Sequence, residues 1–192
     1  AGFYADVEGA PSMEMGADLA RDGRGEPCFV EGRVLTVRDE PVEGAVLDVW
    51  QANHEGFYDV QQPGLQPAMN LRGRFTTGPD GRFRFRTVMP CSYPIPTDGP
   101  VGAMLDRLGR HPYRPAHIHF IVTAPGLEPV TTHIFVEGDP YLDSDAVFGV
   151  KRSLVVPFNR VDDPDALAER GVDRPFHEAR FDFRLEPADR TA

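Results

Sequence analysis

Two histidines separated by a single residue are the strongest chemical signal in the sequence. They are His117 and His119, in the segment HPYRPAHIHF that spans residues 111–120. Successive side chains of a β-strand point to opposite faces, so a strand here would place both imidazoles on one face and Ile118 on the other. Such a pair can bind zinc, copper, iron or nickel. It can also simply line a polar sheet face, so the other ligands must decide.

The remaining ligands are not obvious from spacing. A facial-triad iron(II) site of the cupin type needs an acid soon after the histidine pair, but the next acid is Glu128, beyond a Pro-Gly turn, which weakens that interpretation. Tyr58 and Tyr93 lie in turn-like segments that follow predicted strands. Each tyrosine taken alone fits packing with a satisfied hydroxyl as well as metal ligation.

The elements that must position these residues are mainly short strands. Alternation of apolar and polar residues predicts a pair of strands at 29–37 and 45–50, and a hairpin in which 74–76 and 82–86 flank Gly78-Pro79-Asp80-Gly81. Further strands are predicted at 117–123, 130–136, 153–158 and 181–185, and short helices at 100–109 and 165–170. We therefore expect a mostly β fold, an antiparallel β-sandwich with long active-site loops and few short helices.

Composition bounds the class of protein. The chain has 192 residues, 41% of them hydrophobic, and a formal net charge of −10, which fits one domain over residues 1–192 and argues against nucleic acid or an acidic membrane as a partner. No run approaches the length of a transmembrane helix and no signal peptide is evident, so we expect a cytoplasmic protein. Cys28 and Cys91 are predicted to be free thiols.

Five blocks of the sequence, in order, resemble the intradiol aromatic ring-cleavage dioxygenases, and in particular their hydroxyquinol-cleaving branch. The blocks are GEPCFVEGRVL, DVWQANHEGFYDVQQPGLQPAMNLRGRF, YPIPTDGPVG, HPYRPAHIHF and TTHIFVEGDPYLDSDAVFGVK. Full-length members of this branch resemble this chain only after an N-terminal helical segment that supplies a dimer interface and part of the pocket wall, and the opening Ala1-Gly2-Phe3-Tyr4 resembles, but departs from, a Gly-Pro-Phe-Tyr segment of the family. The competence of the chain as given is expected to depend on how well residues 1–20 close the pocket without a preceding domain.

The resemblance implies a role for each candidate residue. Tyr58, Tyr93, His117 and His119 are similar to the family's ligands of a non-haem Fe(III), with Tyr93 as the tyrosinate that leaves during turnover. Arg114 resembles the active-site arginine, whose fixed positive charge would stabilise carbanion-like character in the ring. His133 stands where catechol-cleaving relatives have glutamine, and we expect it to hydrogen-bond within the site, with core packing as the alternative.

The chemistry of these residue types agrees with that implication. A phenol with an ordinary pKa of about 10 loses its proton readily to a trivalent cation. A ring with adjacent hydroxyls can chelate iron as a dianion, with Tyr93 as one acceptor of its protons. The implied reaction cleaves hydroxyquinol with O2 between its hydroxyls to 3-hydroxy-cis,cis-muconate. Catechol or a chlorocatechol is the alternative substrate, a non-catalytic β-sandwich binding module is the alternative of another class, and a homodimer is left open.

Overall fold

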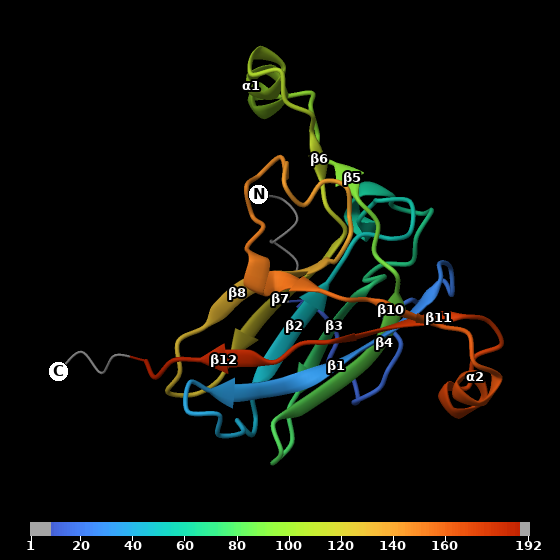
Figure 1. Cartoon of the computed structure of the whole chain (residues 1–192), viewed down its shortest axis with the longest axis vertical. Coiled ribbons are helices and arrows are strands. Elements are labelled where there is room, and N and C mark those ends of the chain that lie inside the picture. The colour runs from blue at the N-terminus through green and yellow to red at the C-terminus, as the bar shows by residue number, and fades with distance from the viewer. Residues whose placement is uncertain (1–8, 189–192) are drawn as a thin grey trace.

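Two five-stranded sheets form the body of the molecule, and the computed structural model describes residues 9–188 (Figure 1). The first sheet has the order β10-β11-β1-β12, with β4 also paired to β1, and the second has the order β3-β2-β7-β8-β9. The strands of the first sheet are β1 (Pro27–Thr36), β4 (Arg82–Val88), β10 (Asn159–Val161), β11 (Phe176–Arg180) and β12 (Phe183–Leu185). Those of the second are β2 (Val46–Trp50), β3 (Arg72–Thr76), β7 (His117–Thr123), β8 (Val130–Val136) and β9 (Val155–Val156).

One hydrophobic core lies between the two sheets. Val30 and Phe85 of the first sheet and Leu47, Ile118 and Phe120 of the second belong to a single buried cluster. Each of these side chains alternates with a neighbour that points away from the core, as period-2 strands require. The outward-pointing positions of β2, β7 and β8 are therefore free to carry functional groups.

The fold-class prediction is confirmed, with one refinement. Most of the regular secondary structure of residues 9–188 is strand, and the two α-helices in this part of the chain are short, α1 (Pro100–Arg107) and α2 (Pro164–Arg170). The sheets are mixed, because β1 pairs in parallel with β11 and β12, and β8 pairs in parallel with β9. Strands distant in sequence thus complete both sheets.

Several element bounds agree closely with the sequence-based prediction. β7 and β8 form an antiparallel hairpin over the predicted residues. Both predicted helices are present, and the Asp163 carboxylate caps α2 by accepting hydrogen bonds from the backbone N–H groups of Asp165 and Ala166. The segment 153–158 is shorter than predicted, because the 3-10 turn η3 (Arg152–Leu154) precedes β9.

Two predicted strand pairings are wrong. Segments 74–76 and 82–86 are strands, but β3 pairs with β2 and β4 pairs with β1, so they belong to different sheets. The turn between them is held at its two ends by different strands: the Ala45 N–H donates to Thr77 Oγ1 at 2.9 Å, and the Val34 N–H donates to the Gly81 carbonyl at 2.8 Å. A Cβ on Gly81 would lie 2.5 Å from the Val34 carbonyl oxygen, so this crossing depends on glycine.

The predicted pairing of 29–37 with 45–50 fails in the same way. β1 pairs with β4, β11 and β12, whereas β2 pairs with β3 and β7. The connection between β1 and β2 therefore also crosses from one sheet to the other, so both of these turns are corners of the sandwich.

A long excursion carries two short strands away from the sheets. β5 (Tyr93–Pro94) and β6 (Tyr113–Arg114) pair with each other, and α1 lies beyond them at the top of Figure 1. Neither helix of the described chain is long and apolar enough to cross a membrane. Cys28 and Cys91 are free thiols, as predicted. The expectation for Ala1–Tyr4 lies outside the described residues, whereas part of the following segment, Pro11–Leu19, hydrogen-bonds to the edges of β3 and β4.

Candidate metal centre

Alternation along β7 creates the candidate site. Ile118 and Phe120 are fully buried in the core, so His117 and His119 project from the opposite face of the same sheet. His119 is paired across the sheet with Trp50 of β2, and the two rings stack with centroids 4.7 Å apart and planes 5° from parallel. The indole therefore fixes the plane of the His119 ring.

The backbone carbonyl of Pro115 holds His117 in one tautomer. Its Nδ1 lies 2.6 Å from the Pro115 carbonyl oxygen, which can only accept, so Nδ1 carries the proton. The lone pair of a neutral His117 is then on Nε2, the nitrogen that faces the other site residues. A carbonyl behind a histidine is a common way to orient a metal ligand.

Tyr58 reaches the site from the loop that follows β2. Asn53 shapes this loop, because its side-chain oxygen accepts hydrogen bonds from the Glu55 and Phe57 N–H groups, each at 3.0 Å. The Tyr58 N–H donates to Gln61 Oε1 at the start of the 3-10 turn η2 (Asp59–Gln61). The phenol ring itself is 3% exposed and packs in a small cluster with Trp50 and Tyr93.

Tyr93 reaches the site from β5, directly opposite Arg114 of β6. Its side chain passes close to Gly56, where an added Cβ would lie only 2.7 Å from the Tyr93 Cβ and where the backbone has a φ of +86°. Glycine therefore allows the loop carrying Tyr58 to approach β5. The Tyr58 and Tyr93 rings meet edge to face at 5.7 Å.

The four side chains converge on one point. The Tyr58 and Tyr93 hydroxyl oxygens are 2.6 Å apart, Tyr58 Oη lies 2.9 Å from His119 Nε2, Tyr93 Oη lies 3.3 Å from His117 Nε2, and the two Nε2 atoms are 3.0 Å apart. Donors that share one transition-metal ion at about 2.0–2.1 Å are separated by about 2.9–3.4 Å when adjacent. The arrangement thus suits a single ion with two oxygen and two nitrogen ligands.

Burial perturbs the protonation of every member of this group. It raises the pKa of Tyr58 well above its ordinary value, with the neighbouring Tyr93 as a further cause, and it raises the pKa of Tyr93 too. Burial also lowers the pKa values of His117 and His119 well below their ordinary range, with nearby positive charge adding to the effect. The imidazoles are therefore neutral and able to donate lone pairs, and a phenol that binds a cation must release its proton.

Arg114 borders the convergent group. Its Nη1 lies 3.1 Å from His117 Nε2, and its Nε donates to Asp145 Oδ1 at 3.2 Å. Its Nη2 is buried and has no hydrogen-bond partner among residues 9–188. A buried guanidinium N–H without a partner is a donor available to a bound molecule.

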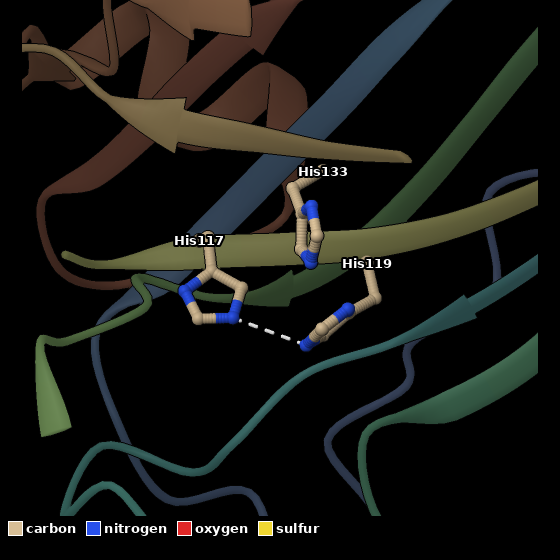
Figure 2. A group of neighbouring side chains, drawn as sticks. All are labelled: His117, His119 and His133. Carbon is tan, nitrogen blue, oxygen red and sulfur yellow. Dashed lines mark hydrogen bonds between the residues drawn. The ribbon is translucent and has the colours of Figure 1, made fainter. Parts of the chain in front are cut away.

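His133 lies beside the histidine pair on β8. It is paired across the sheet with His119, with ring centroids 4.4 Å apart, and its ring is 5.2 Å from that of His117 (Figure 2). One ring nitrogen from each of these three histidines lies within 4.8 Å of the corresponding nitrogens of the other two. Desolvation lowers the pKa of His133 to about 4, so this ring is neutral as well. No hydrogen bond of His133 to a neighbouring site residue has been established, so that expectation stays a prediction.

The structure thus brings together all six residues singled out in the sequence. It also adds three residues that the sequence analysis did not single out: Trp50, which stacks on His119, Asp145, which bonds to Arg114, and Asp59. Asp59 directly follows Tyr58 in the sequence. It forms a buried ion pair with Arg72, in which Asp59 Oδ1 lies 2.8 Å from Arg72 Nε. Trp50 had a signal in the sequence, since it immediately precedes the loop that carries Tyr58.

Comparison with known proteins agrees with this geometry. A sequence profile described as Dioxygenase matches residues 6–187. Hydroxyquinol 1,2-dioxygenase of Rhizobium sp. (strain MTP-10005) is 58% identical over 165 residues, which cover 86% of this chain and 56% of the relative. 6-Chlorohydroxyquinol 1,2-dioxygenase of Cupriavidus pinatubonensis is 55% identical over 94% of this chain and 61% of the relative. The chain therefore belongs to the intradiol ring-cleavage dioxygenase family.

Solved structures place the resemblance within the family. Hydroxyquinol 1,2-dioxygenase from Pseudomonas putida DLL-E4 is 49% identical, with a TM-score of 0.84 over 94% of this chain and 63% of that one. Catechol 1,2-dioxygenase from Acinetobacter radioresistens is 33% identical, with a TM-score of 0.88 over 94% of this chain and 59% of that one. The chain thus resembles hydroxyquinol-cleaving members in sequence and spans about six tenths of the length of these relatives.

Proposed function

We propose that this chain is the catalytic part of an Fe(III)-dependent intradiol dioxygenase that cleaves hydroxyquinol between adjacent hydroxyls. The product would be 3-hydroxy-cis,cis-muconate, the enol form of maleylacetate. The observation that carries the proposal is the convergence of two phenol oxygens and two imidazole nitrogens. Each of these four atoms lies within 3.3 Å of two of the others. The names of relatives that are 49–58% identical support hydroxyquinol as the substrate.

The donor set fits iron in its trivalent state. Tyr58 and Tyr93 would bind as phenolates and His117 and His119 as neutral imidazoles, and hard anionic oxygen ligands favour a hard, highly charged cation. Two phenolates would cancel two of the three positive charges, which lowers the cost of burying the ion. Bound iron would supply Lewis acidity and a place for the ring oxygens to chelate.

The protein side chains would bind the ring and manage its protons. Tyr93 is the more exposed of the two tyrosines, at 9% against 3% for Tyr58, and it contacts Arg114 across β5 and β6. We assign its Oη as an acceptor of a substrate hydroxyl proton. The unpartnered Arg114 Nη2 would donate to the anionic ring and so stabilise negative charge that develops during attack by O2.

His133 is assigned a supporting role. Its ring contacts His119 and His117 from β8, on the face where the four donors meet. A neutral imidazole there can donate one hydrogen bond and accept another, which suits contact with a substrate hydroxyl. We propose that His133 helps to position the ring rather than the metal.

A second candidate is cleavage of catechol or a chlorocatechol. Its support is the TM-score of 0.88 with a catechol 1,2-dioxygenase, because a protein of that name shares this scaffold. The lower identity of that protein, 33%, makes it the runner-up.

A single-domain organisation over residues 1–192 is part of the proposal, since one core joins both sheets.

One assay separates these candidates. The protein is loaded with Fe(III), and O2 uptake and product absorbance are followed with hydroxyquinol and with catechol at equal concentrations. We expect equimolar consumption of O2 and hydroxyquinol, with 3-hydroxy-cis,cis-muconate as product and at least tenfold lower kcat/KM for catechol. Preference for catechol would select the runner-up, and an iron-loaded protein that consumes neither substrate would favour a non-catalytic binding module.

A further inference from the structure

The loop before η3 sends one carboxylate into the site. Asp145 is 3% exposed, and its Oδ1 accepts from Arg114 Nε at 3.2 Å. The loop's own backbone holds this carboxylate, because the Gly149 N–H donates to Oδ2 at 2.8 Å and the Val147 N–H donates to Oδ1 at 3.3 Å. The backbone of the loop thus holds the Asp145 carboxylate independently of its contact with the Arg114 guanidinium.

The loop is in turn anchored to the segment that leads into β6. Arg110 Nη2 donates to the Asp145 carbonyl at 3.0 Å, the Ala146 N–H donates to the Tyr113 carbonyl at 3.0 Å, and His111 Nε2 lies 2.8 Å from Ser144 Oγ. The residues that precede Arg114 and the residues around Asp145 therefore form one hydrogen-bonded unit. Movement of Arg114 relative to Asp145 would break several bonds at once.

The three nitrogens of the Arg114 guanidinium have different surroundings. Nε is bonded to Asp145, Nη1 faces His117 Nε2, and Nη2 is buried with no partner in the described chain. A guanidinium is planar, so a bond at Nε fixes the direction of the other two nitrogens. The guanidinium is therefore held with Nη1 beside the imidazole that we assign as a metal ligand and with Nη2 as the nitrogen without a partner in the described chain.

Gly149 leaves the space that this arrangement needs. A Cβ at this position would lie 3.1 Å from Asp145 Oδ2 and 3.2 Å from Arg114 Nη2. Both distances are tighter than ordinary van der Waals contact, so a methyl group here would press on the carboxylate and on the free nitrogen together. A small residue at position 149 keeps the pair undistorted.

We propose that Asp145 is a positioning residue that fixes the Arg114 guanidinium so that Nη2 can donate to the bound ring diol. The role rests on the proposed function, and it acts through Arg114 rather than by contact with iron or substrate. Asp145 also supplies the negative charge that allows the buried guanidinium to remain in place before substrate arrives. The loop 139–149 thereby contributes to substrate affinity without touching the four donor atoms.

A double-mutant cycle tests this role with 4-nitrocatechol as the probe. Binding is measured from the absorbance of the bound nitrocatecholate under anaerobic conditions, so no turnover is needed. We expect Asp145→Asn to weaken binding about tenfold when Arg114 is present and less than about twofold in the Arg114→Ala background. Iron content and the visible band are expected to match those of the wild type, because Asp145 contacts none of the four donors.

Asp80→Asn is the matched control, since it removes the same charge from an exposed ion pair with Arg82, 3.4 Å apart, and should not change affinity. If Asp145→Asn does not fold, the same cycle is run with Gly149→Ala. Equal losses in both Arg114 backgrounds, or wild-type affinity in Asp145→Asn, would overturn the positioning role. Wild-type protein that binds nitrocatechol but does not oxidise hydroxyquinol would overturn the proposed function alone, and one that binds no nitrocatechol would overturn both.

Discussion

The buried ion pair behind Tyr58 gives a sharp prediction about stability. Arg72 and Asp59 have side chains 1% and 7% exposed, and Arg72 Nε donates to Asp59 Oδ1 at 2.8 Å. Asp59 Oδ2 accepts from the Met69 N–H at 3.0 Å, while Arg72 Nη1 and Nη2 have no partner within residues 9–188. The Asp59 carboxylate is thus the counter-charge of a guanidinium that is almost completely removed from water.

We therefore expect Asp59→Asn to destabilise the protein strongly. Removing one partner of a buried ion pair costs about 3–5 kcal/mol, because the remaining charge stays buried without compensation. An asparagine oxygen can still accept the bond from Nε, which places the expected loss near the lower end, about 3 kcal/mol. For a domain of this length, that loss corresponds to a decrease in Tm of about 6–12 °C.

The measurement is urea unfolding followed by the fluorescence of Trp50 and by circular dichroism, on the iron-free protein so that metal affinity does not contribute. Asp80→Asn is the control, because the Arg82–Asp80 pair is 65% and 64% exposed and should contribute less than about 1 kcal/mol. The double variant Asp59→Asn with Arg72→Met should recover at least half of the loss. A single variant within 1 kcal/mol of the wild type, or a double variant less stable than the single, would refute this reasoning.

Three further predictions concern the metal centre and the core. Iron-loaded protein should be red-brown from phenolate-to-Fe(III) charge transfer, and Tyr58→Phe should abolish or strongly shift that visible band; an iron-replete but colourless wild type would contradict the ligand set. Removing iron with a chelator should lower the Tm in a way that added Fe(III) reverses, because an ion that binds only the folded state stabilises it; calorimetry with and without metal checks this. Ile118→Ala should reduce the free energy of unfolding by about 2–5 kcal/mol, since the side chain is completely buried; a loss below 1 kcal/mol in urea unfolding would show that the core can collapse around the gap.

The positions of the candidate site residues were predictable where the signal is local. Two histidines one residue apart on an apolar, β-branched stretch predict a shared strand face, and His117 and His119 do lie on one face. The tyrosines were different. Nothing in the spacing of Tyr58 and Tyr93 brings them together, and only the family resemblance singled them out; their meeting depends on the Gly56 approach and on the pairing of β5 with β6.

Strand pairing was the part that local reasoning could not supply. The Gly78-Pro79-Asp80-Gly81 turn has the residues of a hairpin connection, yet the strands on its two sides join different sheets. Turn chemistry specifies a reversal of direction but not the partner of the strand that follows. Here β3 pairs with β2 and β4 pairs with β1, and the parallel strands β11 and β12 complete the first sheet from the far end of the chain.

One face of β7 packs in the hydrophobic core and the other carries the candidate metal ligands, so the packing of the core fixes which side chains reach the metal centre. Inserting one residue just before His117 would exchange the faces, sending imidazoles into hydrocarbon and Ile118 toward the loops. Such a slip penalises every position of the strand at once, so an ensemble of shifted registers is not accessible to the folded protein. Aliphatic side chains of the core, which do not contact the proposed substrate, thus determine which face of β7 carries His117 and His119.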